Sequence, residues 1–154
     1  YKSKTRKHDD IVPEERIEEM LIFQYNTGTL VKYIGTGIID IYKKDNPNDQ
    51  SMWISDCSRL NYVVKTIVDG DDRWAMDKKG MRVIKKVTVP LLKEIYNIMR
   101  EYLNNKRFHE VTRFGEYSKK LNAIFGIMDS VETQSMHTDI VRFIAPYFSI
   151  ESEL

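Results

Sequence analysis

The segment from Ser55 to Lys86 constrains the fold of this chain more than any other part of the sequence. Five apolar residues in its first half recur at the spacing of one helical stripe. These residues are Leu60, Val63, Val64, Ile67 and Val68. The pattern predicts an amphipathic helix that begins at Ser55 or Asp56 and ends at Gly70.

The second half of the same segment predicts a β-hairpin. Residues 73–77 and 81–87 fit two short strands, and Lys78-Lys79-Gly80 fits their connection because Gly80 suits a positive φ. A helix followed by a cationic hairpin is typical of a winged-helix unit, in which the helix enters a DNA groove and the hairpin contacts phosphate.

Helical periodicity dominates the remainder of the chain. Apolar stripes predict helices that begin at Pro13 and near Thr29, a long helix from Thr88, and two further helices in the last third. Gly35 and Gly37 weaken the second of these helices and are compatible with a close helix crossing. We therefore predict an α+β fold that is mostly α, with a winged-helix-like core and additional C-terminal helices. The predicted organisation is a flexible arm over 1–12, a winged-helix-like domain over 13–104 and a helical extension over 105–154 that packs on the core.

Composition narrows the class of protein. Over 154 residues, a hydrophobic content of 42% supports a buried core, and 31% charged residues favour solubility. No apolar run approaches the roughly 18–20 residues that span a bilayer, so we expect no membrane partner. The N-terminal segment lacks both an apolar stretch and a Met, so we expect no signal peptide and a piece of a longer protein. Cys57 is the single cysteine; its position predicts a buried thiol in a reducing, intracellular compartment.

Positive charge is concentrated in residues 73–107. This segment carries ten Lys or Arg and three acidic residues, a local charge of +7 in a chain of net charge +1. Such a concentration suits contacts with nucleic-acid phosphates, because each neutralised phosphate releases counterions. The alternative is a solvated surface, in which lysines also protect an edge strand from mispairing.

Candidate nucleic-acid-binding residues lie on both parts of the predicted unit. Arg59, Tyr62 and Thr66 recur on the exposed side of the predicted helix, where an arginine can pair with guanine and a tyrosine hydroxyl with phosphate. Tyr62 could equally pack under another element. The full predicted set is Arg59, Tyr62, Lys65 and Thr66 on the helix, with Lys78, Lys79, Arg82, Lys85 and Lys86 on the hairpin.

No catalytic or metal-binding constellation competes with this interpretation. His8, His109 and His137 are dispersed, and no pair has the spacing of a metal site. The acidic group around Gly70 fits a turn better than a magnesium site. The sequence contains neither a glycine-rich phosphate loop nor a nucleophile elbow. We therefore predict a non-enzymatic protein that has no cofactor, no metal and no small-molecule substrate.

Four motifs fall between residues 30 and 103. They are Gln50-Ser51-Met52-Trp53, Ser55 to Leu60, Trp74 to Gly80, and Pro90-Leu91-Leu92. Their order resembles a domain of uncharacterised paralogous proteins of giant, amoeba-infecting DNA viruses of the mimivirus type. In that family the domain often follows a zinc-finger-like segment, which this chain lacks. The resemblance implies a viral, intracellular protein of the host cytoplasm (the viral factory) or the virion that acts on DNA; it transfers no catalytic residue.

Two functions from different classes follow. The leading prediction is a non-enzymatic DNA-binding or DNA-associated viral module that uses the helix and the basic hairpin. The alternative is a protein–protein interaction or oligomerisation domain with a winged-helix shape and no nucleic-acid binding. It depends on the wide apolar face of residues 91–103, which predicts a homo-oligomer.

Overall fold

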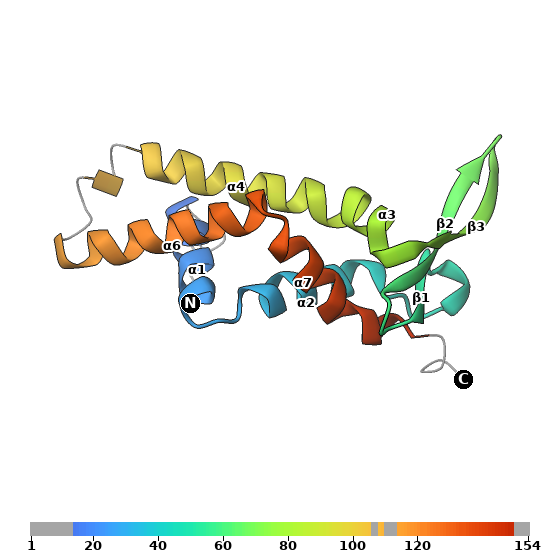
Figure 1. The fold of residues 1–154 in the computed structure, drawn as a ribbon. Helices are drawn as coiled ribbons and strands as arrows, with labels where there is room; N and C mark the ends of the chain where they lie inside the picture. Colours follow the sequence, from blue (N-terminus) through green and yellow to red (C-terminus); the bar gives the residue numbers. More distant parts are fainter. Residues whose placement is uncertain (1–13, 106–107, 110–113, 150–154) are drawn as a thin grey trace, which may run out of the picture. The chain divides into compact units, whose positions relative to one another are not determined.

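The computed structural model describes residues 14–105, 108–109 and 114–149, and its course is drawn in Figure 1. The arm predicted over residues 1–12 lies outside these ranges. The described chain is mostly helical and contains one small antiparallel sheet, so the α+β class dominated by helix is confirmed. The winged-helix core is not confirmed, because the segment on which it depended folds differently.

Helices make up most of the described elements. The helices are α1 (Glu14–Asn26), α2 (Leu30–Tyr42), α3 (Met81–Val83), α4 (Val89–Asn104), α6 (Phe114–Glu132) and α7 (Ser135–Ile144). Shorter helical turns are η2 (Pro47–Asp49), η3 (Lys78–Gly80), the π-helical η4 (Ile84–Thr88) and η5 (Ala145–Phe148). The strands are β1 (Met52–Asp56), β2 (Asn61–Val68) and β3 (Asp71–Asp77), in the order β1-β2-β3.

The chain divides into two units. The first consists of Tyr1–Leu30 and Ile95–Asp129, and the second of Val31–Glu94 and Ser130–Leu154. The division into 13–104 and 105–154 stays a prediction. Segments distant in sequence belong to the same unit, which a division by sequence order does not anticipate.

Polar and aromatic contacts join the helices of the first unit. The Glu19 carboxylate of α1 accepts a hydrogen bond from the Tyr102 hydroxyl and lies 2.8 Å from the Lys120 ammonium of α6. The Phe108 ring lies between two tyrosine rings, with centroids 4.8 Å from Tyr102 and 5.4 Å from Tyr117. These contacts connect α1, the end of α4 and α6 through side chains from all three.

The predicted helix over residues 55–70 is wrong, because half of this segment forms β2. The apolar run from Leu60 to Val68 fits a helical stripe, but it is rich in β-branched residues, which favour a strand. Asp69 and Gly70 both have positive φ, of 52° and 84°. Two such residues form the tight hairpin loop that joins β2 to β3, with Val68 opposite Asp71.

The predicted strand over residues 81–87 is also wrong, although β3 confirms a strand over 73–77. Lys78–Gly80 forms a helical turn, and the chain continues as helix through α3 and η4 into α4. The Asp77 carboxylate causes this change, because its oxygens accept the backbone N–H groups of Arg82 at 2.6 Å and Val83 at 3.1 Å. Such a carboxylate satisfies the free donors at a helix N-terminus.

Helix α7 packs on the sheet in the second unit. The Tyr62 side chain of β2 is fully buried, and its hydroxyl donates to the Val141 carbonyl of α7 at 2.8 Å. Burial raises the pKa of Tyr62, so the phenol stays protonated as this donor. Beyond the helix, Ser149 forms an isolated parallel bridge with Ile54 of β1. The sheet and the C-terminal helix therefore share one core.

The two glycines of α2 have different surroundings. A Cβ added to Gly35 would overlap the Phe143 ring of α7, whereas one added to Gly37 would meet nothing within 4 Å. The close helix crossing compatible with the sequence is therefore present at Gly35 and not at Gly37.

We expect Gly35→Ala to lower the free energy of unfolding by about 1–3 kcal/mol, because the methyl group overpacks the core. Gly37→Ala should raise it by about 0.5–1 kcal/mol through higher helix propensity. Denaturant unfolding of the two variants measures both changes. Equal effects of the two substitutions would contradict the crossing at Gly35.

A buried histidine links α7 to the π-helical turn. The His137 Nδ1 atom lies 2.9 Å from the Thr88 hydroxyl, which also donates to the Ile84 carbonyl at 2.9 Å. Burial lowers the pKa of His137 below its usual value of 6.5. The folded state therefore binds a proton at this site less readily than the unfolded state does.

Stability should accordingly fall as the pH decreases from 7.5 through 6.5, because protonation then favours the unfolded chain. His137→Gln should remove part of this pH dependence, measured by urea unfolding at pH 7.5 and 5.5. An unaltered slope in the His137 variant would show that this imidazole does not titrate as described.

Candidate nucleic-acid interface

The structure separates the predicted binding residues. Arg59 lies in the turn between β1 and β2, with its side chain 80% exposed and its Nε 3.7 Å from the Asp56 carboxylate. The Ser58 hydroxyl donates to the same carboxylate at 2.8 Å and, as the largest cause, lowers the pKa of Asp56. Arg59 is therefore an accessible cation beside an ionised partner, in a turn rather than on a groove-binding helix.

The other three residues predicted on the helix, Tyr62, Lys65 and Thr66, lie on strand β2. Tyr62 is buried, so its prediction as a groove-facing residue is wrong. Lys65 lies on the opposite face of β2, with its ammonium 5.3 Å from the centre of the Trp74 ring. The Thr66 hydroxyl donates to the Arg73 carbonyl at 3.2 Å. Because side chains of a strand alternate between faces, these residues do not form one recognition surface.

The other five predicted residues stay together. We define the basic segment as residues 78–86, which contain five cations and no acid. The cations are Lys78, Lys79, Arg82, Lys85 and Lys86, and all five are exposed. Within the described ranges, none of them forms an ion pair. The segment lies on η3, α3 and η4, so its predicted place on a hairpin is wrong while its predicted exposure is correct.

Local backbone contacts fix the start of the basic segment. The Asn61 amide oxygen accepts the Lys79 N–H at 3.1 Å, and Gly80 has a φ of 68°. A Cβ on Gly80 would lie 2.8 Å from Val141 and 3.6 Å from the Tyr62 ring. The adjacent Asp77 is only 2% exposed and is occupied by backbone donors. The segment is thus anchored by polar backbone contacts that leave its cationic side chains in solvent.

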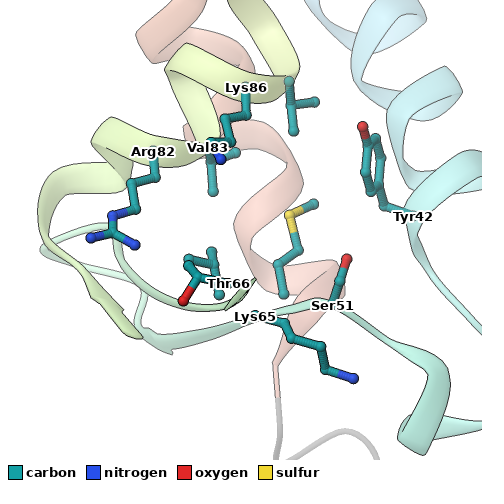
Figure 2. A pocket seen from close by; sticks show the side chains of 10 residues that line it. Tyr42, Ser51, Lys65, Thr66, Arg82, Val83 and Lys86 are labelled. Atoms are coloured by element: carbon teal, nitrogen blue, oxygen red, sulfur yellow. The ribbon is translucent and has the colours of Figure 1, made fainter. Parts of the chain in front are cut away.

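A cavity of about 240 Å³ lies beside the basic segment. Ten residues line it, from α2, β1 with the Ser51 before it, β2 and the helix after β3, and none of the ten is acidic. They are Tyr42, Ser51, Met52, Val64, Lys65, Thr66, Arg82, Val83, Lys86 and Val87. Figure 2 shows Tyr42 and Ser51 on one side and Arg82 on the other, while the Lys65 side chain extends away.

Sequence reasoning missed this cavity. Its walls come from four separate elements, and no motif joins them. Arg82 and Lys86 are four residues apart and share a face in a strand as well as in a helix, so their spacing gave no signal of the cavity.

Other predicted features are placed differently. Cys57 is exposed in the turn between β1 and β2, so the predicted buried thiol is wrong. Among the described residues, no group of three or more acidic, histidine or cysteine side chains could hold a metal ion. No helix in the described ranges combines the length and apolar character needed to cross a membrane.

The apolar face of residues 91–103 is largely buried within a single chain. Leu92 and Met99 have no exposed surface, and Ile95 and Tyr102 are 6% and 5% exposed. Ile98 and Leu103 are half-buried, and Leu91 is exposed at 37%. The width of this face therefore does not require a second subunit, and the homo-oligomer stays a prediction.

No protein-family model, curated protein or solved structure matches the chain. The resemblance to a domain of giant DNA viruses, with the viral and intracellular setting that it implies, therefore stays a prediction.

Proposed function

We propose that the chain is a non-enzymatic DNA-binding module that contacts phosphates through the basic segment. The observation that carries the proposal is the group of five exposed cations within residues 78–86, none of them paired with a carboxylate among the described residues. A cation with a carboxylate partner would exchange one partner for another on binding. An unpaired cation instead neutralises a phosphate and releases its counterion.

The competing interpretation was a solvated surface, and one part of it was that the lysines protect a strand edge from mispairing. That role requires the lysines to lie on an edge strand. Lys78, Lys79 and Lys85 lie on helical turns and not on a strand, and the Lys79 N–H bonds the Asn61 side chain, so they offer no strand edge. Edge protection therefore does not account for these cations, which supports the phosphate-binding role.

The predicted effect of charge removal is specific to the basic segment. Lys78→Gln with Lys85→Gln should weaken DNA binding and reduce the slope of log affinity against log salt by about 2, about 1 for each lysine that contacts a phosphate. Fluorescence anisotropy with labelled DNA over a salt series measures both quantities.

Lys32→Gln with Lys119→Gln is the matched control, because it removes the same charge from two exposed lysines outside the basic segment. This control should retain the slope of the unmodified protein. If both double variants lose affinity equally, net charge alone governs binding and the basic segment is not the contact surface. If the unmodified protein does not bind DNA, the proposed function is wrong.

A further inference from the structure

The cavity beside the basic segment has the chemistry of a nucleotide pocket. Resting on the proposed function, we infer that this cavity receives one unpaired nucleotide, so that the module binds single-stranded DNA in preference to duplex DNA. The base would enter the cavity, and its flanking phosphates would contact Arg82 and Lys86. The inference follows from the volume, the lining and the charge of the cavity.

The volume suits one small ring. A cavity of roughly 150 Å³ in another protein holds benzene, and the volume here is about 240 Å³. Met52, Val64 and Val83 are buried and supply apolar walls, with Val87 beside them. A pyrimidine base offers two apolar faces of matching size, and its transfer from water to these walls is favourable.

The polar groups of the lining lie where a base and its phosphates need them. The side-chain hydroxyl groups of Tyr42 and Ser51 form no hydrogen bond with any described residue, so both are available to the edge of a base. Figure 2 places them across the cavity from Arg82. A buried base edge without partners would be costly, and these hydroxyls provide both donors and acceptors.

The charge of the lining matches a nucleotide within a strand. Such a nucleotide has one negatively charged phosphate on each side, and Arg82 and Lys86 supply two positive charges from one helical face. Lys78, Lys79 and Lys85 belong to the same basic segment, so the phosphates beyond the bound nucleotide also meet cations. No carboxylate lines the cavity to repel them.

This arrangement discriminates between forms of DNA. A base within a duplex is paired and stacked, and its entry into a pocket requires it to leave the helix at a cost of a few kcal/mol. The free-energy cost of base entry is lower for a single strand, because its bases are already unpaired. Duplex DNA therefore uses the basic segment alone, whereas a single strand uses the basic segment and the cavity.

The test compares an oligothymidylate with a duplex of the same length at fixed salt, by fluorescence anisotropy. The unmodified protein should bind the single strand about tenfold more tightly. Val87→Phe, which fills the cavity, should remove most of this preference and leave duplex binding unchanged. Lys85→Gln, on the same segment but outside the cavity lining, should weaken both forms alike.

The thermal unfolding midpoint of Val87→Phe shows whether this variant folds. A second variant tests the inference if it does not. Tyr42→Phe with Ser51→Ala removes the two free hydroxyls without added bulk, and it should selectively weaken single-strand binding. Equal affinity for the two DNA forms, or a folded cavity variant that keeps the preference, overturns the inference while the proposed function stands. Failure of both DNA forms to bind overturns the proposed function itself.

Discussion

The Asp77 carboxylate determines how the second unit is built. It ends β3 and supplies acceptors to the N–H groups of Arg82 and Val83. Without those bonds, two backbone donors at the start of a helix would lack partners inside the protein. The same carboxylate is nearly inaccessible to solvent, so it does not pair with the exposed lysines that follow. One buried acid thus fixes a helix and leaves a positively charged surface on it.

The helices were predictable because their periodicity is long and regular. Helices predicted to begin at Pro13, near Thr29 and near Thr88 are confirmed as α1, α2 and α4, and the two in the last third as α6 and α7. Each carries several turns of apolar residues, and over that length a helical period cannot be mistaken for alternation. Contacts between these helices, such as that of Gly35 with Phe143, are seen only in the tertiary structure.

The sheet was mispredicted because a short apolar run satisfies two periods at once. Between Leu60 and Val68 almost every second or third position is apolar, so the stripe did not distinguish helix from strand. The deciding signal was the Asp69-Gly70 pair, a strong indicator of a tight hairpin. Lys78-Lys79-Gly80 also contains a glycine with positive φ, but there the glycine precedes a helix. The hairpin loop was assigned to Gly80 and not to Gly70. As a result, the segment before Gly70 was predicted as a helix and the segment after Gly80 as a strand.

The candidate site was predictable only in part, for a similar reason. Cations such as Lys78 and Lys85 are exposed whether the segment is a strand or a helix, so the prediction of their exposure was correct although the secondary structure was wrong. Tyr62 did not, because the face on which a side chain lies depends on the period of its element. The cavity depends on four elements meeting in space, and no local pattern in the sequence encodes that meeting.

The π-helical turn over Ile84–Thr88 determines the direction in which the side chains that follow it face. A π turn accommodates one residue more than an α turn, and such turns are typically found at functional sites. Removal of a single residue here would restore regular α-helix and rotate everything beyond it by about 100° about the axis. Arg82 and Lys86 would still share a side, because residues three or four apart are neighbours on a regular helix. Leu92, which follows the turn and is fully buried, would instead rotate out of the core, so the extra residue keeps the buried side of α4 in register.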